Sequence, residues 1–295
     1  MKVIVTGAAG LVGRAVVSVF SARGEAVTGF DHQNLDISDE RAVRRVVSAS
    51  SPEVLVNCAA WTNVDGCESD QERAIRANAL GPELLALACS DVGAIFITIS
   101  TDYVFDGHKD GFYTQRDQPN PQSVYAVSKL EGERRAQNTW ARTIIVRSGY
   151  IFGAGGSNFL STFVERARHG EPLKVINDCV GTPTYAPHLA DRLHQLAQVD
   201  LPGLYHVVNS GGGVSFAQFA ERTFELEGLD SGLLKTVSME SLSRPAPRPR
   251  NSRLSCLLSD AIGLGPMPLW TDGLRDFLAQ SPPVSRPWQA GTVTF

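Results

Sequence analysis

The sequence predicts a doubly wound α/β fold, in which helices cover both faces of a mostly parallel sheet. In the first half of the chain, short β-rich runs alternate with longer segments that have a helical period. The β-rich runs are almost continuously apolar, as expected for strands that are buried on both faces. Strict alternation of strands and helices is typical of a sheet built from βαβ units.

The individual elements follow in order along the chain. The expected strands are "KVIVTG", "AVTGFD", "EVLVNCAA", "AIFITIS" and "TIIVRS", and the expected helices cover residues 11–23, 39–49, 70–91 and 121–138. After Ser148 the rhythm changes. A Gly-rich loop at 153–156 precedes a helix at 158–169, a short strand near "LKVIND", a helix at 187–199 and the sheet-like run "GLYHVVNS".

The last of these runs is expected to return to the main sheet, so that two lobes are interleaved in sequence. We expect a larger domain from residues 1–148, with about 187–210 returning to it, and a smaller lobe from residues 149–186 and 211–295. At 295 residues the chain is long enough to bury a sizeable core in this arrangement.

Composition and charge restrict the classes of partner. Hydrophobic residues make up 43% of the chain, charged residues 20%, and the net charge is -4, which gives no basic excess that would favour nucleic acid. The start, "MKVIVTGAAG", is apolar over too short a run for a signal peptide, and no run approaches the ~18 apolar residues of a membrane span. We therefore expect a cytoplasmic protein with no membrane segment.

The cysteines and histidines show no metal-binding or disulfide pattern. Five cysteines are an odd number, and they are widely spaced without a C-x-x-C pair. The six histidines are scattered as well. We expect reduced cysteines and no bound metal.

A Gly-rich loop directly follows the first expected strand. In "TGAAGLVG", Gly7, Gly10 and Gly13 stand where the strand turns into a helix. Glycines at these positions let the backbone approach a pyrophosphate, which the helix N-terminus then holds. Such turns also serve packing alone, but the position inside a βαβ unit favours dinucleotide binding on a Rossmann-type fold.

The end of the second expected strand bears on the choice of cofactor. Asp31 lies at the distance expected for a carboxylate that accepts hydrogen bonds from the adenine ribose and repels a 2′-phosphate. No Arg or Lys follows between 31 and 40, so the sequence favours NADH over NADPH, although Arg14 or Lys2 could also reach this region. In "NLDIS", Asp36 and Ile37 are candidate adenine contacts, and a helix cap is the alternative reading of Asp36.

Tyr125 and Lys129 form a candidate catalytic pair. Residues four apart lie on the same face of a helix, and a nearby ammonium group is expected to lower the pKa of a tyrosine from about 10 toward neutrality. Two helix neighbours without a catalytic role are the alternative. The position favours catalysis, because the fourth strand ends in "ISTDYVFDG" and delivers Ser100 and Thr101 to the ligand crevice of such sheets.

Together these motifs resemble an extended short-chain dehydrogenase/reductase, a family that binds NAD(P)(H) and commonly acts on nucleotide sugars. Within it, the chain resembles the dTDP-4-dehydrorhamnose reductase family over essentially its whole length. The segments that carry this resemblance are, in order, "VNCAAWTNVDGCES", "STDYVFDG", "VYAVSKLEGE", "GGSNF", "VINDCVGTPT", "GLYHVV" and "RPRNSRL".

The resemblance implies reduction of the C4 keto group of dTDP-4-dehydro-L-rhamnose to give dTDP-L-rhamnose, an oxidoreductase step in carbohydrate biosynthesis. It implies that Tyr125 donates a proton, that Lys129 tunes Tyr125 and binds the ribose, and that Thr101 polarises the keto group. The implied cofactor contacts are Gly7, Gly10, Leu11, Val12, Gly13, Asp31, Asp36, Ile37, Ala59, Ala60, Trp61, Thr62, Asn78, Ser100, Tyr125 and Lys129. Asn78 matches an asparagine that often supports a water beside the lysine.

The implied substrate contacts are Val64, Thr101, Asp102, Tyr103, Tyr150, Asn158, Arg250 and Arg253. The two arginines belong to the Pro/Arg-rich segment "SRPAPRPRNS" at 243–252, which otherwise reads as a surface loop. They are placed near the diphosphate, since guanidinium groups match phosphate geometry. The implied partner is a small nucleotide sugar, and the chain is expected to be a monomer or a homodimer.

Several positions depart from the family pattern. Where the family usually reads R-T-S-W, this chain has Arg147, Ser148, Gly149 and Tyr150. Where it often has D-Q, Asp178 is followed by Cys179. These departures leave the identity of the substrate's sugar and base undetermined. Ala15 replaces a glutamate that some members associate with an interface metal, which again predicts no metal.

Two other functions remain as alternatives. A nucleotide-sugar dehydratase or epimerase shares the cofactor motifs, but dehydratases typically follow the strand-end Thr-Asp with a glutamate, where this chain has Tyr103. A reductase that acts on a different 4-keto nucleotide sugar belongs to the same group of alternatives and is more similar to the proposed enzyme. The non-catalytic beta subunit of methionine adenosyltransferase is also similar in "TGAAGLVGRAV" and "RPRNSRL", although Asp31 and the "WTNVD" and "SNF" segments follow the reductase more closely.

Overall fold

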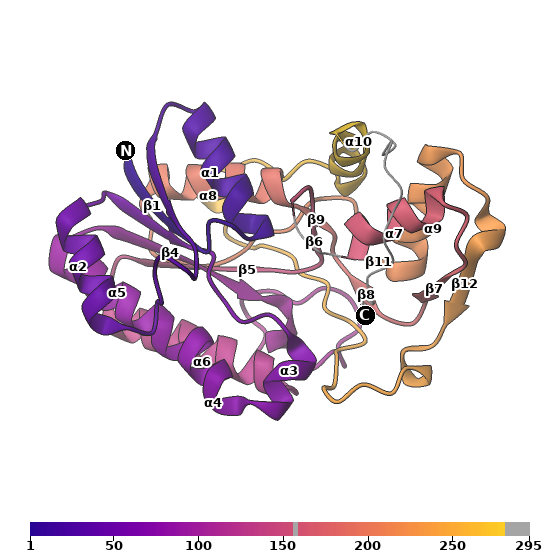
Figure 1. The fold of residues 1–295 in the computed structure, drawn as a ribbon, viewed down its shortest axis with the longest axis horizontal. Helices are drawn as coiled ribbons and strands as arrows, with labels where there is room; N and C mark the ends of the chain where they lie inside the picture. Colours follow the sequence, from indigo (N-terminus) through magenta and orange to yellow (C-terminus); the bar gives the residue numbers. More distant parts are fainter. Residues whose placement is uncertain (156–158, 281–295) are drawn as a thin grey trace.

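The computed structural model describes residues 1–155 and 159–280, which form a larger α/β domain beside a smaller lobe (Figure 1). The larger domain contains a six-stranded parallel sheet with the strand order β10-β5-β4-β3-β1-β2. Its strands are β1 (Lys2–Thr6), β2 (Ala26–Phe30), β3 (Val54–Asn57), β4 (Ile95–Thr101), β5 (Thr143–Ser148) and β10 (Gly203–His206). The predicted doubly wound Rossmann-type fold is confirmed.

Helices cover both faces of this sheet (Figure 1). One face carries α1 (Leu11–Ala22) and α8 (Ala186–Val199), and the other carries α2 (Glu40–Ser50), α5 (Gly81–Val92) and α6 (Val124–Thr139). Alternate strand residues point to opposite layers: Val3 and Val5 pack in the α1/α8 layer, whereas Ile4 packs in the α2/α5 layer. Burial on both faces explains the nearly continuous apolar runs of these strands.

The segment between β3 and β4 is more divided than the single predicted helix at 70–91. It consists of α3 (Val64–Ser69), α4 (Gln71–Ile75), a π-helical turn (Arg76–Leu80) and α5. The π turn lies against α6 at Gly132, where an added Cβ would be 2.1 Å from the carbonyl oxygen of Asn78. Close approach of the two helices therefore depends on this glycine.

Helix α6 starts at Val124, three residues later than predicted. The Ser123 side chain accepts a hydrogen bond from the backbone N–H of Ala126 and so caps the helix. The residues before Ser123 belong to the loop that follows η2 (Asp102–Val104). This cap fixes the point from which Tyr125 and Lys129 project.

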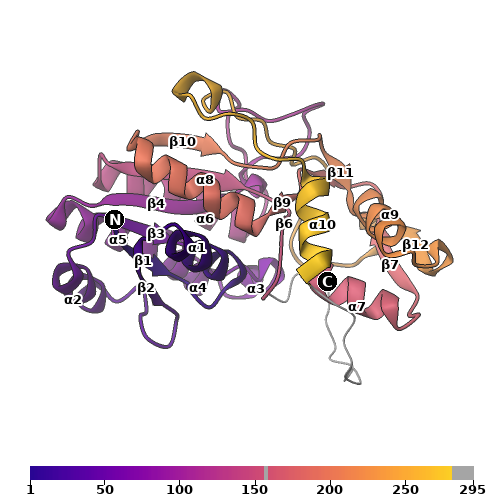
Figure 2. The ribbon, with the colours of Figure 1, turned by 90° about the horizontal axis from the view of Figure 1, so that it is seen from above.

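The smaller lobe lies beyond the carboxyl ends of the main strands (Figure 2). Its short strands are β6 (Ile151–Phe152), β7 (Leu173–Ile176), β8 (Val180–Gly181), β9 (Thr184–Tyr185), β11 (Val214–Ser215) and β12 (Leu234–Val237). Its helices are α7 (Phe159–Arg168), α9 (Phe216–Glu227) and α10 (Trp270–Gln280), with short turns η3 (Ser231–Leu233) and η4 (Met239–Ser241); η5 (Asp260–Ile262) lies against the larger domain.

The smaller lobe has a separate hydrophobic core. Phe152, Phe219 and Trp270 belong to it, together with buried residues of α7, β7 and α10. The strand near "LKVIND" pairs in parallel with β12 rather than with the main sheet. In contrast, α8 packs on α1 and β10 pairs with β5, so the chain leaves the main sheet after β5 and comes back to it.

Within the part of the chain that the structure describes, no helix is long and apolar enough to cross a membrane. The same residues contain no group of three or more His, Cys, Asp or Glu side chains that could hold a metal ion. All five cysteines are free.

Candidate active site

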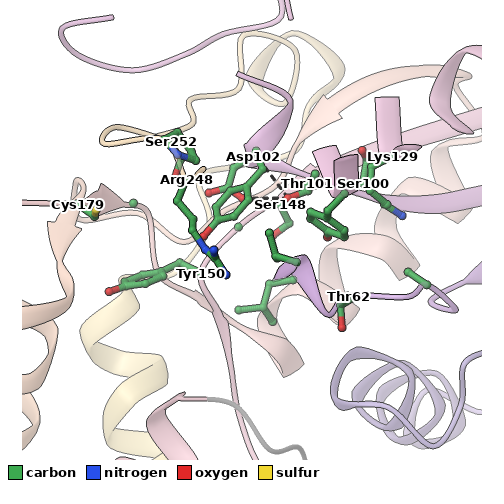
Figure 3. A pocket seen from close by; sticks show the side chains of 18 of the residues that line it. Thr62, Ser100, Thr101, Asp102, Lys129, Ser148, Tyr150, Cys179, Arg248 and Ser252 are labelled. Carbon is green, nitrogen blue, oxygen red and sulfur yellow. Dashed lines mark hydrogen bonds between the residues drawn. The ribbon is translucent and has the colours of Figure 1, made fainter. Parts of the chain in front are cut away.

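A cavity of about 480 Å³ lies between the two lobes, at the carboxyl ends of β4 and β5. Residues of the larger domain form one wall, which we call the sheet-side wall; it includes Thr101, Tyr125 and Lys129. The opposite wall, the lobe-side wall, is formed by Gly149, Tyr150, Ile151, Ile176, Cys179, Val180, Gly181, Phe216, Met239, Arg244, Arg248, Pro249 and Ser252. Figure 3 shows Tyr150 and Cys179 at one end of the cavity and Lys129 and Thr62 at the other.

Tyr125 and Thr101 meet at the sheet-side wall. Thr101 is the last residue of β4, Tyr125 lies in the first turn of α6, and both line the cavity. The Thr101 hydroxyl donates a hydrogen bond to Asp102 and accepts one from the backbone N–H of Tyr103, each at 3.2 Å. Burial raises the pKa of Tyr125 above its usual value, and the nearby Asp102 carboxylate acts in the same direction. Tyr125 is therefore protonated near neutral pH, as a proton donor must be.

The pKa of Tyr125 is raised, whereas the sequence led us to expect that Lys129 would lower it. The Nζ of Lys129 donates a hydrogen bond to the carbonyl oxygen of Ile99 at 2.7 Å, and the side chain is buried. Burial lowers the pKa of Lys129 itself to about 8, against the opposing effect of Glu133. The expected effect fails because burial of the phenol outweighs a cation whose hydrogen bond is directed elsewhere.

A buried ion pair lies behind Lys129. Arg147 of β5 donates two hydrogen bonds to Glu133 of α6, at 2.9 and 2.6 Å, and both side chains are almost inaccessible to solvent. Ser100 donates a third hydrogen bond to the same carboxylate. The second and third turns of α6 are thereby tied to the ends of β4 and β5, and loss of one partner of such a pair typically costs about 3–5 kcal/mol.

Asp102 lies where the two walls meet. Burial raises its pKa to about 6, although hydrogen bonds from Ser252 and Thr101 partly offset this effect. Its carboxylate lies so close to Gly149 that a Cβ on residue 149 would be 2.2 Å from the carboxyl carbon. Glycine at 149, one of the departures from the family pattern, is therefore what allows this position of Asp102.

A second cavity of about 840 Å³ adjoins the Gly-rich loop. It is lined by the predicted cofactor residues Gly7, Gly10, Asp31, Asp36, Ile37, Ala59, Ala60 and Trp61. Gly7 has a φ of 67° and lies against the backbone of Cys58 and Ala59, a geometry that favours glycine. Gly13 is buried in α1, where a Cβ would lie 2.1 Å from the carbonyl oxygen of Gly7. The close packing of α1 against the Gly-rich loop therefore requires glycine at this position.

Two arginines that sequence reasoning missed also line the second cavity. Arg73 stacks over the Trp61 ring at 4.5 Å, and Arg76 lies 3.9 Å from the Asp36 carboxylate. They come from the segment after β3, about 40 residues beyond Asp31, so inspection of residues 31–40 could not find them. Asp36 does not cap α2, because Asp39 does so. Arg14 donates to the carbonyl of Ala9.

Asn78 holds the loop that separates the two cavities. Its side chain accepts from the backbone N–H of Trp61 at 2.8 Å and donates to the Trp61 carbonyl and to Ser128, each at 3.0 Å. These bonds anchor residues 59–62 to α6. The expected support of a water beside Lys129 stays a prediction.

The lobe-side wall differs from the sequence-based assignment in its arginines. Arg244 and Arg248 line the first cavity, whereas Arg250 pairs with Glu240 at the surface and Arg253 bonds to Asn251 and lies over Phe112. Arg248 forms a two-point ion pair with Asp65, at 2.5 and 2.7 Å. The Nε atom of Arg244 is buried without a hydrogen-bond partner among the described residues.

The structure brings most other predicted residues into the first cavity. Its lining includes Gly10, Leu11, Val12, Ala60, Thr62, Val64, Ser100, Thr101, Asp102, Tyr103, Tyr125, Lys129 and Tyr150. Tyr150, at a φ of 52°, packs edge-on against Phe216, and its buried hydroxyl has no hydrogen-bond partner among the described residues. Asn158 lies outside the described residues. Phe216, Met239 and Ser252 are lining residues that the sequence did not indicate.

A Gly-rich loop over a parallel sheet and a Tyr/Lys pair beside a strand-end threonine define the class of extended short-chain dehydrogenases/reductases. Residues 1–282 match the model of the RmlD substrate binding domain, and the chain belongs to this family. The dTDP-4-dehydrorhamnose reductase of Streptomyces griseus is 39% identical over 279 residues, covering 92% of this chain and 91% of the relative.

Two further relatives bear on cofactor and substrate. A crystal structure of dTDP-4-dehydrorhamnose reductase from Bacillus anthracis in complex with NADP has a TM-score of 0.91 and 33% identity, covering 95% of this chain and 100% of that one. The probable dTDP-4,6-dihydroxy-2-methyloxan-3-one 4-ketoreductase of Streptomyces antibioticus is 32% identical, covering 97% of this chain and 99% of the relative.

Proposed function

We propose that this protein reduces the C4 keto group of dTDP-4-dehydro-L-rhamnose to give dTDP-L-rhamnose. The observation that carries the proposal is that the protonated Tyr125 and Thr101 line the same wall of a cavity that reaches the Gly-rich loop. The 39% identical relative named for this reaction supports the choice of substrate.

Tyr125, Thr101 and Lys129 each have a separate role in the proposed reaction. Reduced nicotinamide, when bound, supplies the hydride that adds to C4. Tyr125 donates its proton to the oxygen of the former keto group, and the Thr101 hydroxyl on the same wall hydrogen-bonds to that oxygen. Lys129, held on the Ile99 carbonyl, places a positive charge beside the nicotinamide ribose and the developing phenolate.

For the cofactor we propose NADPH or NADH, with NADH preferred. Asp31 lies in the second cavity, where its carboxylate would repel a 2′-phosphate. Arg73 and Arg76 add positive charge to that cavity, but they are engaged with Trp61 and with Asp36 and Ser38. The ratio of kcat/KM for the two cofactors tests this preference. Asp31→Asn is expected to shift that ratio toward NADPH.

For the diphosphate of the substrate we propose Arg244 and Arg248 rather than Arg250 and Arg253. The first two line the cavity, and the buried Nε of Arg244 is free to donate to an anion. We propose that residues 149–186 and 211–295 act as the substrate-binding lobe, since the described part of this region contains the lobe-side wall.

The direct test supplies dTDP-4-dehydro-L-rhamnose, made in situ by the enzymes that produce it, with NADH or NADPH in separate reactions. Loss of reduced-nicotinamide absorbance that requires the sugar nucleotide is the expected result. No turnover with either cofactor would show the proposal to be wrong. Size-exclusion chromatography and cell fractionation test the proposed monomer or homodimer and the proposed cytoplasmic location.

A second candidate is reduction of a different 4-keto sugar. Tyr150 and Cys179 form one end of the cavity and both depart from the family pattern, and a relative named as another 4-ketoreductase is 32% identical. Parallel assays with other dTDP-4-keto-6-deoxy sugars distinguish the two candidates by their kcat/KM values. A dehydratase is less well supported, because the Tyr103 ring packs edge-on against Tyr125 at the position where a dehydratase has a carboxylate.

A further inference from the structure

Residues 244–249, which we call the arginine loop, bring Arg244 and Arg248 to the lobe-side wall of the first cavity. The loop contains no helix or strand. Three of its six residues are prolines, which have no N–H group to donate to a regular backbone ladder. The position of the two arginines therefore depends on contacts that the loop makes with other parts of the molecule.

Asp65, in the first turn of α3 in the larger domain, makes the most extensive of these contacts. Its carboxylate accepts a hydrogen bond from the backbone N–H of Ala246 at 3.0 Å and two from the Arg248 guanidinium, at 2.5 and 2.7 Å. Arg248 also donates to the carbonyl oxygen of Ala246 at 2.7 Å. The bonds of Arg248 use three of the five N–H donors of a guanidinium group. One carboxylate thus fixes both the backbone of the loop and an arginine side chain.

Helix α3 gives Asp65 a fixed position in the larger domain. Asn63 caps the start of this helix through a hydrogen bond from the helix backbone. Further along α3, the Glu68 side chain accepts a hydrogen bond at 2.9 Å from the backbone N–H of Val124, the residue before Tyr125. The same short helix therefore contacts both the arginine loop and the start of the helix that carries Tyr125.

The charge of Asp65 has two opposing effects on an anion in the cavity. Hydrogen bonds from Arg248 hold the pKa of Asp65 below its usual value, so the carboxylate is ionised near neutral pH. Burial and the neighbouring Arg248 lower the pKa of Arg244, whereas Asp65 raises it, so the carboxylate offsets the repulsion between the two arginines. The negative charge itself, however, repels an anion. Removal of Asp65 should therefore weaken anion binding if positioning dominates and strengthen it if charge dominates.

We propose that Asp65 is a positioning residue for the diphosphate of the substrate. Asp65 lines neither cavity, and it acts by holding the arginine loop so that Arg244 and Arg248 face the diphosphate. The geometry of its three hydrogen bonds carries this inference. The inference rests on the proposed function, in which these two arginines bind the diphosphate.

The test measures the Kd of dTDP by isothermal titration calorimetry, together with steady-state kinetics of the sugar nucleotide. Asp65→Ala should raise this Kd and the KM of the sugar nucleotide by about tenfold, while kcat and the Kd of NADH stay within about twofold. Asp65→Asn keeps an oxygen for Ala246 but loses the charge, so it should have a smaller effect in the same direction. It carries the test if Asp65→Ala does not fold. Unchanged or tighter dTDP binding by the folded variants would overturn the inference.

Glu227→Gln is the matched control. Glu227 of α9 and Arg168 of α7 form a partly buried ion pair with two hydrogen bonds, but neither residue lines the first cavity. Its loss should leave the Kd of dTDP within about twofold, whatever its effect on thermal unfolding. A loss of affinity as large as that of Asp65→Ala would show that any broken ion pair has this effect, and would count against a specific role of Asp65.

A double-variant comparison shows whether Asp65 acts through Arg248. In an Arg248→Ala background, Asp65→Ala should raise the Kd of dTDP by less than about threefold, because the main partner of the carboxylate is already absent. The full tenfold effect in that background would overturn the inference. A wild-type protein that does not bind dTDP would overturn the proposed function and this inference together, whereas normal wild-type binding with unaffected Asp65 variants would overturn this inference alone.

Discussion

The sheet-side and lobe-side walls of the active-site cavity are held in place by different kinds of structure. Thr101 and Tyr125 project from the end of β4 and the first turn of α6, and buried bonds through Ser100, Glu133 and Arg147 fix both elements. The lobe-side wall consists of short strands and loops, in which Tyr150 has a positive φ. The residues proposed for catalysis thus lie on rigid elements, whereas the residues proposed for substrate recognition lie on segments that can vary.

The largest expected effect tests the sheet-side wall. Tyr125→Phe removes the proton donor and leaves the Gly-rich loop and Lys129 in place, so kcat should fall by about 10³ or more while NADH affinity stays within about twofold. Steady-state kinetics and cofactor titration by fluorescence measure the two quantities. Undiminished turnover would show that another group supplies the proton.

The second prediction concerns Asp102, where the walls meet. Because its pKa in the folded protein is raised to about 6, its contribution to stability is fully present below about pH 4 and is lost as the pH rises through 6. The free energy of unfolding of the wild type, minus that of Asp102→Asn, should fall by about 2 kcal/mol between pH 4.5 and 7.5. Urea unfolding at both pH values measures it, and a pH-independent difference would contradict the burial argument.

The third prediction separates the arginines of the lobe-side wall. Arg244→Ala should raise KM for the sugar nucleotide and Kd for dTDP by about tenfold or more with little change in kcat, since a charged hydrogen bond to the diphosphate is lost. Arg250→Ala, on the same segment but paired with Glu240 at the surface, is the matched control and should change KM by less than about twofold. The opposite pattern would favour the assignment made from family resemblance.

The smallest expected effect concerns the Tyr150 hydroxyl. Tyr150→Phe keeps the ring against Phe216 and removes a buried hydroxyl that has no hydrogen-bond partner among the described residues. If this hydroxyl meets the sugar, kcat/KM should fall a few-fold for the preferred 4-keto sugar and less for others, while thermal unfolding shows unchanged or slightly higher stability. A uniform effect on all sugars would assign Tyr150 to packing alone.

Sequence reasoning succeeded where local pattern determines position. Strand ends of a parallel sheet meet at one edge, so "ISTDYVFDG" and the Tyr125/Lys129 spacing were sufficient to predict the sheet-side wall. It failed where position depends on distant partners: Arg248 faces the cavity because of Asp65, and Arg73 and Arg76 reach the cofactor cavity by way of the segment after β3. The pKa of Tyr125 could not be predicted either, because it depends on how deeply the phenol is buried. The spacing of Tyr125 and Lys129 in the sequence does not show this.

The return of the chain to the main sheet after the first part of the smaller lobe has a consequence for engineering and evolution. Residues 149–185 lie between β5 and α8, and α8 packs on α1 at the far side of the sheet. No single cut therefore separates the two lobes, and a contiguous cassette cannot exchange one of them. Because two crossings of the chain join the lobes, they should melt together in a single calorimetric transition.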